Sequence, residues 1–330
     1  MADIDIEVGW HAGILDAVRI KARTPNPSAA LVGLSPATVA AMLGRLYAAC
    51  GAAQRACAEL ALGAASGAGL APERHHRLAA AVAAEAIQER LWRLWLDWPP
   101  ALGLAPRRDE FTYWWGCIQS GAADWPTRLA ATLERDWLGT PFTALTRFGV
   151  LAEFDAWCAA GRSPAATLFA ALGAEPAAAA RSAPPGEPSA GADRRHPWSA
   201  ALSAAGRGLE WHLAQRMLSL AALDEVLQHY PPPSVEMISG STAAGRGFAT
   251  VATARGRLRH EVSLCDGHVE SYAIQTPTER HFAADGPFAA SILGRRAADG
   301  AAARRIASLW ALAFDPCVSY AVADPGAAHA

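Results

Sequence analysis

One stretch of the sequence, residues 173–193, consists of alanine, proline, glycine and serine with little else. Such a segment cannot bury much apolar surface, so we interpret it as a flexible linker. It separates an N-terminal region, residues 1–172, from a C-terminal region, residues 194–330. A chain of 330 residues is long enough for two domains or for one large core with an insertion, and we expect the two regions to form one composite domain.

The N-terminal region begins with the pattern of a β-hairpin. Ile4, Ile6 and Val8 alternate with polar residues, and a turn at residues 11–13 leads into a second strand at residues 14–20. Period-two alternation places these apolar side chains on one face of the sheet.

Helices are predicted for the rest of this region. Ser35 and Pro36 are a favourable N-cap and first-turn residue, and a single helix is predicted from there to the glycines at 63–69. A second helix is predicted from Pro72 until Pro99–Pro100 ends it. The region that follows is predicted to be helical, with its tryptophans packed in the core: Trp114, Trp115, Trp125, Trp137 and Trp157.

The C-terminal region repeats the two kinds of element. A helix is predicted over residues 198–229, and a hairpin over residues 258–275 with its turn at Asp266–Gly267. A last helix over residues 301–313 leads to the end of the chain. The fold class expected is therefore α+β, a helix-dominated body with N- and C-terminal β-hairpins.

Several classes of protein are excluded. A formal charge of −2 argues against a broad nucleic-acid surface, and no segment has the basic amphipathic pattern of a membrane-surface helix. Residues 1–8 lack the features of a secretory signal, and no apolar run of about 18 residues predicts a membrane span. We therefore expect a cytoplasmic protein whose six cysteines are thiols.

The cysteines differ in what their neighbours imply. Cys50 and Cys57 would lie roughly 10 Å apart along one helix, so both could bind one metal ion only if the helix breaks, which Gly51 would permit. Cys57 reads as a core thiol, and Cys265 belongs to the Asp-Gly hairpin turn. Cys117 and Cys158 also read as core thiols.

Two residues near the chain end and the hairpin are less easily explained. Cys317 follows Asp315–Pro316 after an apolar helix, where a structural role is less obvious. His260 lies on the apolar face of its strand, either as a satisfied core histidine or as a hydrogen-bond donor to a metal ligand.

Four segments stand out by their motifs and by their order along the chain. They are residues 45–54 (RLYAACGAAQ), residues 92–99 (WRLWLDWP), the hairpin region from Ala254–Arg255–Gly256 to Pro277–Thr278, and residues 314–320 (FDPCVSY). Together they resemble the large subunit of nickel–iron hydrogenases, and more specifically the hydrogenase expression/formation proteins of the HupK/HoxV type. The resemblance implies a fold like that of the large subunit.

The sequence departs from the enzyme in its thiols. In the enzyme family each terminal motif supplies two cysteines, and the four thiolates hold nickel and iron together. Here Cys50 and Cys317 remain, whereas Ala53 and Tyr320 stand at the other two positions. Neither side chain can replace a bridging thiolate. We therefore expect that the chain is not a hydrogenase and not an enzyme.

The resemblance implies what the remaining residues bind. Cys50 and Cys317 would be the metal ligands, holding an iron fragment whose other positions are filled by cyanide and carbon monoxide. Arg255, His260 and Asp315 would lie around this cofactor. Arg255 offers planar N–H donors to the cyanide nitrogens, and Asp315 would orient Arg255 or the Cys317 backbone.

Two functions follow from the resemblance. The first is a maturation factor for nickel–iron hydrogenase, a scaffold that holds the iron fragment transiently and passes it to the hydrogenase large subunit. The alternative is a metal-free assembly factor that mimics the large subunit and binds maturation proteins. An unrelated redox enzyme has little support, because no dinucleotide fingerprint or nucleophile elbow is found. In either case the expected partners are the large subunit and the hydrogenase maturation proteins.

Overall fold

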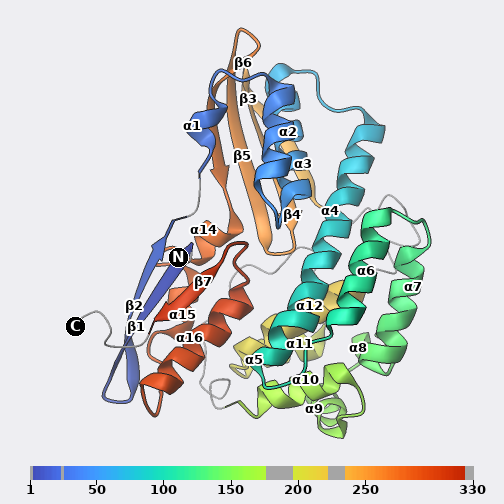
Figure 1. Cartoon of the computed structure of the whole chain (residues 1–330), viewed down its shortest axis with the longest axis vertical. Coiled ribbons are helices and arrows are strands. Elements are labelled where there is room, and N and C mark those ends of the chain that lie inside the picture. Colours follow the sequence, from blue (N-terminus) through green and yellow to red (C-terminus); the bar gives the residue numbers. More distant parts are fainter. Residues whose placement is uncertain (1–2, 24–25, 176–195, 222–234, 324–330) are drawn as a thin grey trace.

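The computed structural model describes residues 3–23, 26–175, 196–221 and 235–323. They form a helical body, a four-stranded sheet at one end of it and a small sheet beside it (Figure 1). Most of the predicted linker lies outside the described residues, as do residues 222–229 of the predicted helix. The division of the chain into domains therefore stays a prediction.

The strands make two sheets, and the helices include two short π-helical stretches, η1 and η2. The strands are β1 (Ile4–His11), β2 (Ile14–Ala22), β3 (Met237–Ala243), β4 (Arg246–Thr253), β5 (Gly256–Cys265), β6 (His268–Gln275) and β7 (Tyr320–Ala323). The helices are α1 (Ser28–Leu31), α2 (Pro36–Leu46), α3 (Gly51–Ser66), α4 (Pro72–Trp92), η1 (Arg93–Asp97), α5 (Trp98–Ala101), α6 (Arg108–Ser120), α7 (Trp125–Thr132), η2 (Leu133–Leu138), α8 (Phe142–Thr146), α9 (Leu151–Ala160), α10 (Pro164–Gly173), α11 (Pro197–Ala204), α12 (Gly208–Ala221), α14 (Pro277–His281), α15 (Pro287–Ile292) and α16 (Gly300–Phe314).

The small sheet joins the two ends of the described chain. The predicted N-terminal hairpin is confirmed, because β1 pairs antiparallel with β2. On its other side β1 pairs in parallel with β7, with Ile4 opposite Tyr320. The sequence did not predict β7, which is only four residues long. This pairing brings the segment that contains Cys317 next to the first strand (Figure 1).

The four-stranded sheet contains the predicted C-terminal hairpin. Strands β5 and β6 pair antiparallel around Asp266–Gly267, both of which adopt positive φ, as a tight two-residue hairpin turn requires. Strands β3 and β4, which were not predicted, complete the sheet in the order β3-β4-β5-β6. Helix α3 packs on β4 and β5, and this layer has its own apolar core (Figure 1).

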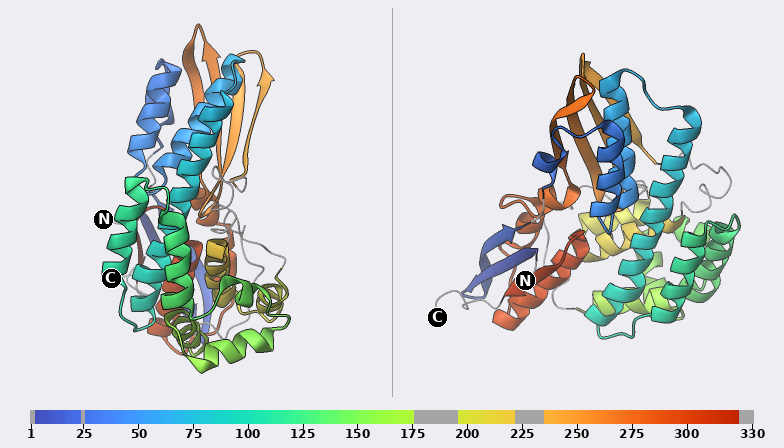
Figure 2. Two further views of the ribbon diagram at one scale, coloured as in Figure 1. Left: turned by 90° about the vertical axis from the view of Figure 1, so that its right-hand side faces the viewer. Right: turned by 45° about the horizontal axis from the view of Figure 1, so that its top comes forward.

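Helix α4 connects this layer to the helical body (Figure 2). Leu78 and Val82 in its first half belong to the core between sheet and helices, whereas Ile87 and Leu91 belong to the core of the helical body. One helix therefore contributes to both cores. Glu85 and Glu89, which lie between or beside these apolar positions, face the site described below.

The predicted fold class, helix-dominated α+β, is confirmed by these elements. The tryptophan-rich region is helical, and Trp114, Trp125 and Trp137 are buried in the core, as predicted. Trp115 and Trp157 are half-buried, and Trp157 packs against this core.

Three details of the helix prediction are wrong. The helix predicted from Ser35 is two helices, α2 and α3, separated by residues 47–50. Pro99 and Pro100 do not end the second helix but lie in the first turn of α5, where a missing N–H costs nothing. The helix predicted after residue 198 is interrupted at Gly206, whose φ of +75° is left-handed.

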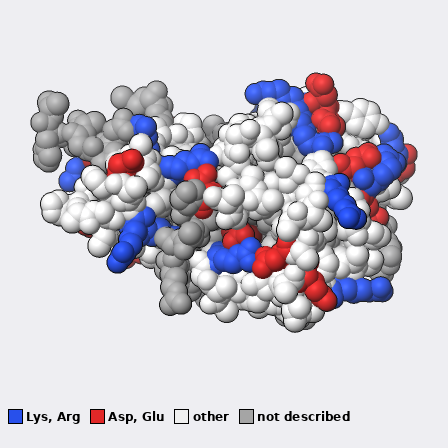
Figure 3. All heavy atoms as spheres, turned by 90° about the horizontal axis from the view of Figure 1, so that it is seen from below, with Lys and Arg blue, Asp and Glu red and all other residues white. Residues whose placement is uncertain are grey.

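The outer surface in Figure 3 carries basic and acidic side chains side by side, so neither sign forms a continuous patch on the described part of that face. None of the helices within the described ranges combines the length and the hydropathy that a membrane span requires.

Gly247 of β4 allows the close approach of α3 to the sheet. A Cβ atom there would lie 2.4 Å from the Ala61 carbonyl oxygen and 2.5 Å from the Ala65 nitrogen. Because both contacts are with backbone, we expect Gly247→Ala to lower the free energy of unfolding by about 1–3 kcal/mol. Gly116→Ala is the control, since α6 has open space there and alanine favours a helix. Urea unfolding checks the pair, and equal midpoints for the two variants would contradict the packing argument.

Candidate metal-binding site

Cys50 lies at the break between α2 and α3 and immediately precedes the first residue of α3. The break depends on a close backbone contact, because a Cβ atom on Gly51 would lie 2.5 Å from the Gly44 carbonyl oxygen. Because of this break, Cys50 and Cys57 do not lie on one continuous helix, which is the condition that a metal site shared by both cysteines would require. Cys57 nevertheless does not join Cys50, because its buried thiol donates to the Ala249 carbonyl, 3.4 Å away in β4.

A carboxylate of α4 fixes the start of α3. Glu85 accepts hydrogen bonds from the backbone N–H groups of Ala52 at 2.6 Å and Ala53 at 3.1 Å. These are among the first N–H groups of the helix, which have no partners within it. Burial raises the pKa of the Glu85 carboxyl to about 7, although the two N–H groups act in the opposite direction.

Cys317 lies near the other end of the chain, and Thr278 fixes its position. Asp315 ends α16 in the left-handed conformation, with φ of +53°. The Thr278 hydroxyl then contacts Cys317 twice, donating to its Sγ at 3.2 Å and accepting from its backbone N–H at 3.2 Å. Thr278 is itself placed by the start of α14, where Thr276 and Glu279 form a reciprocal capping box.

The two thiols line the same cavity. The interaction with the Cys50 thiol lowers the pKa of Cys317 to about 6, with further lowering by the charge of Arg255. The interaction with Cys317, together with burial, raises the pKa of Cys50 well above its ordinary value. Both cysteines line a cavity of about 640 Å³ whose other lining residues include Leu46, Tyr47, Ile274, Val318 and Glu279.

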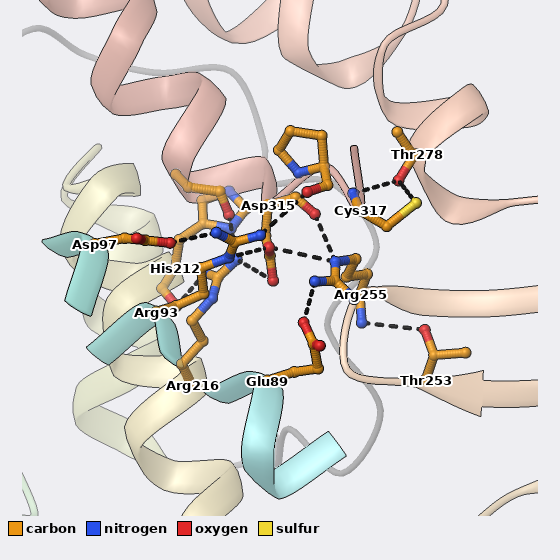
Figure 4. Close-up of polar contacts among 12 residues, drawn as sticks. Glu89, Arg93, Asp97, His212, Arg216, Thr253, Arg255, Thr278, Asp315 and Cys317 are labelled. Atoms are coloured by element: carbon orange, nitrogen blue, oxygen red, sulfur yellow. Dashed lines mark hydrogen bonds and ion pairs between the residues drawn. The ribbon is translucent and has the colours of Figure 1, made fainter. Parts of the chain in front are cut away.

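Behind the thiols, Asp315 is surrounded by guanidinium groups (Figure 4). It pairs with Arg93 of η1, with Arg216 of α12 at 3.6 Å and with Arg255 at 3.3 Å. Burial alone would raise the pKa of the Asp315 carboxyl, but the charges of Arg255, Arg93 and Arg216 hold it well below its usual range. The carboxylate is therefore ionised although it is 2% exposed.

Arg255 lies between this cluster and the thiols. Its Nε donates to the Asp315 carbonyl oxygen at 2.9 Å, and its Nη2 pairs with Glu89 of α4 (Figure 4). Burial opposes its charge, but Asp315 and Glu89, with Cys317 and Cys50 nearby, raise its pKa. A fully ionised, positively charged group therefore stands beside the thiol pair.

Sequence reasoning missed the part of α4 and η1 that supports this arrangement. Glu85, Glu89, Arg93 and Asp97 follow one another at intervals of four residues, so they share one face of the helix. Glu85 holds the start of α3, Glu89 holds Arg255, and Arg93 holds Asp315. The sequence does contain a signal for this charged face. Four charged residues recur at regular spacing on a helix whose other residues contribute to two apolar cores.

The predicted residues are not all brought together. Arg255 contacts Asp315, and Cys50 and Cys317 line one cavity beside them. His260 does not contact the thiols directly. Its Nε2 lies 2.9 Å from Gln54 Oε1, and the Gln54 amide nitrogen lies 3.8 Å from Cys50 Sγ. Burial lowers the pKa of His260 to about 3, so the ring is neutral. Its role toward a bound group stays a prediction.

The remaining cysteines lie away from this cluster. Cys158 is buried in the helical core, as predicted, Cys117 is half-buried against it and Cys265 is exposed at the hairpin turn. Within the described ranges no group of three or more His, Cys, Asp and Glu side chains is arranged to hold a metal ion. The site therefore offers two thiols rather than a complete set of protein ligands.

The fold is that of the hydrogenase large subunit. The nickel–iron–selenium hydrogenase of Desulfovibrio vulgaris Hildenborough in the reduced state superposes with a TM-score of 0.55 and 12% identity, over 93% of this chain and 94% of that chain. The NAD+-reducing nickel–iron hydrogenase in the H2-reduced state superposes with a TM-score of 0.51 and 15% identity, over 92% and 93% of the two chains.

Sequence relatives define the family more narrowly. The hydrogenase expression/formation protein HupK of Rhodobacter capsulatus is 30% identical over 328 residues, 93% of each chain. HupK of Rhizobium leguminosarum bv. viciae is 29% identical over 97% of this chain and 95% of its own, and HoxV of Cupriavidus necator 28% over 85% and 86%. No protein-family model matches the chain. The chain belongs to the HupK/HoxV family of hydrogenase expression/formation proteins, related to the nickel–iron hydrogenase large subunit.

Removing the shared anion should destabilise the fold. Asp315→Asn leaves Arg93, Arg216 and Arg255 without their common counter-charge, and breaking a buried ion pair from one side costs about 3–5 kcal/mol. Asp97→Asn is the matched control, because Asp97 is partly exposed and pairs with Arg93, so its loss should cost about 1 kcal/mol or less. Urea unfolding of both variants measures the difference, and similar losses would show that Asp315 is not the central charge.

The raised pKa of Glu85 predicts a pH dependence. The folded protein holds this proton more tightly than the unfolded chain, so the contribution of Glu85 to stability is fully present below pH 4.5 and is lost as pH rises through about 7. Glu85→Gln cannot titrate, so the urea midpoint of the wild type should fall relative to that of the variant across this window. Glu73→Gln, on the exposed first turn of α4, is the control. Parallel pH profiles for the wild type and Glu85→Gln would refute the assignment.

Proposed function

We propose that this protein is a scaffold for hydrogenase maturation, which holds an iron fragment carrying cyanide and carbon monoxide and passes it to the hydrogenase large subunit. The observation that carries the proposal is the meeting of Cys50 and Cys317, from opposite ends of the chain, at one cavity. Family membership supports the biological setting, because the relatives are hydrogenase expression/formation proteins.

The chemistry of the donors suits such a fragment. Thiolates are soft ligands, and iron saturated with strong-field diatomic ligands needs few of them from the protein. The thiol pair loses its first proton easily, because the remaining thiol and Arg255 both stabilise the thiolate of Cys317. A negatively charged iron fragment would also be favoured by the buried guanidinium of Arg255.

The incomplete ligand set suits a carrier. Ala53 and Tyr320 stand where the enzyme family has two further cysteines, so the fragment would be held by two thiolates instead of four. Fewer protein ligands hold a metal group less tightly, and an acceptor that offers all four would be the more stable site. The same substitutions argue against hydrogenase activity, and we propose that the chain is not an enzyme.

The partners proposed are the hydrogenase large subunit and the proteins that build its metal centre. A carrier must receive its fragment and release it, so its cavity must be reachable by both. Leu46, which lines the cavity, is 53% exposed, so this part of the cavity wall is open to solvent.

Infrared spectroscopy tests the carrier function. Protein purified without oxygen from cells that are producing hydrogenase should show bands of iron-bound cyanide and carbon monoxide. Cys50→Ser and Cys317→Ser should each remove the bands, because each takes away one of two thiolates. Cys265→Ser, at the exposed hairpin turn, should leave them unchanged.

The opposite outcome identifies the alternative function. A featureless spectrum from folded protein would reject the carrier and favour the metal-free assembly factor that binds maturation proteins by its likeness to the large subunit. Bands that survive in both Cys50→Ser and Cys317→Ser would instead place the fragment elsewhere on the protein.

A further inference from the structure

A buried chain of polar side chains leads from the four-stranded sheet to Cys50. The His260 ring of β5 contacts the Tyr272 hydroxyl of β6 through Nδ1 at 2.8 Å, and it contacts Gln54 Oε1 of α3 through Nε2 at 2.9 Å. Gln54 Nε2 in turn lies 3.8 Å from Cys50 Sγ. His260 and Gln54 are both 0% exposed and Tyr272 is 7% exposed, so these contacts are made away from bulk water.

Secondary structure fixes the positions of these residues. Tyr272 lies two positions from Ile274, the residue opposite His260 in the pairing of β5 with β6, so both side chains lie on the same face of the sheet. Helix α3 packs on that face. Gln54 lies one helical turn after Cys50, and its backbone N–H donates to the Cys50 carbonyl oxygen at 2.9 Å.

The direction of the hydrogen bonds follows from the donors and acceptors available. The oxygen and nitrogen of an amide side chain can exchange places, and so can the protonated and bare nitrogens of a neutral imidazole, so the whole network determines the arrangement. The Tyr272 hydroxyl has no choice, because within the described ranges His260 is its only hydrogen-bond partner. A buried O–H group without an acceptor is costly. The Tyr272 hydroxyl therefore donates to Nδ1 of His260, which must be the bare nitrogen.

The remaining contacts then have one arrangement. His260 carries its proton on Nε2 and donates it to Gln54 Oε1, which leaves Gln54 Nε2 on the side of Cys50. With the amide reversed, Nδ1 of His260 would have to donate to Tyr272, and the Tyr272 proton would have no acceptor. A cysteine that binds a metal does so as a thiolate, which can only accept hydrogen bonds. An N–H group of Gln54 is the matching donor.

We infer that Tyr272, His260 and Gln54 form a directional hydrogen-bond chain, in which each residue donates to the next and Gln54 donates to the sulfur of Cys50. Gln54 is thus a positioning residue, which orients this sulfur and withdraws charge from it when a metal is bound. The inference rests on the proposed function and deepens it, because it names the residue that controls one of the two thiolates of the carrier. His260 acts on that thiolate only through Gln54.

Nuclear magnetic resonance tests the direction of the chain on the full-length, metal-free protein. With isotope-labelled histidine, the His260 signals are identified by their loss in His260→Gln. We expect a proton bonded to Nε2 and none bonded to Nδ1. Tyr272→Phe removes the donor to Nδ1, so it should shift the Nδ1 resonance and leave the proton on Nε2. A proton on Nδ1, or on both nitrogens, would overturn the inference.

The side-chain amide signal of Gln54 tests the sulfur end of the chain in the same metal-free protein. This signal is identified by its loss in Gln54→Leu. Cys50→Ala removes the acceptor, so it should move the amide proton resonance upfield. Cys265→Ala, at the exposed hairpin turn, is the control and should leave the resonance in place. Equal amide shifts in the two cysteine variants would contradict the proposed contact.

Infrared spectra of the loaded protein test the role of Gln54 toward a metal. Gln54→Leu removes the N–H donor, so the Cys50 sulfur should donate more electron density to iron, and the carbon monoxide and cyanide bands should move to lower frequency. Gln119→Leu, at an exposed position of α6, is the matched control and should leave the bands in place. Bands at unchanged frequency in Gln54→Leu would refute the role of Gln54 while the carrier function would stand.

The inference and the proposed function can fail separately. The resonance experiments need no iron, so they decide the hydrogen-bond chain even if the protein shows no infrared bands and the carrier function is rejected. Conversely, infrared bands in a protein whose His260 carries its proton on Nδ1 would support the carrier and reject the chain.

Discussion

The buried carboxylate of Asp315 joins parts of the chain that are far apart in the sequence. Arg93 comes from the helix after α4, Arg216 from α12 and Arg255 from the turn between β4 and β5. A buried charge is stable only when opposite charges and hydrogen bonds surround it, so the carboxylate and its guanidinium partners require one another. These partners come together only when the helical body, the four-stranded sheet and the C-terminal segment have all assembled. Cys317, two residues further on, is positioned as a consequence.

The parts of the fold that the sequence predicts are those determined by local chemistry. Alternating apolar residues and the Asp266–Gly267 turn predict the hairpins, and Ser35 caps α2 as expected. Other features depend on contacts made only in the folded chain. The break before Gly51 requires the carbonyl of Gly44, and β7 requires β1. The strand β3 escaped prediction because its sequence, MISGSTA, is made largely of small residues without clear alternation.

The sequence predicted some residues of the site and missed others. Cys50, Cys317, Arg255 and Asp315 were identified from the resemblance to a family, and the chain brings them together. The supporting charges of α4 were not identified, because charged residues on an amphipathic helix usually face water. Glu89 is instead 6% exposed, since it faces Arg255 across the interface between the sheet layer and the helical body. Only the folded structure shows that this face of the helix is inside.

Ala53 and Tyr320 stand where the resemblance to the enzyme family would place two further cysteines. Ala53 is fully buried in the core beneath the sheet, and its N–H group is held by Glu85. Tyr320 begins β7 and pairs with Ile4, so it helps to join the two ends of the chain. These contacts of Ala53 and Tyr320 are made by backbone atoms, so the fold does not depend on a thiol at either position. The fold thus keeps the framework that brings two thiols together, while the other two positions contribute to packing and strand pairing. For the carrier function that we propose, such a site would hold a metal fragment by one side and leave its other side free for the next protein.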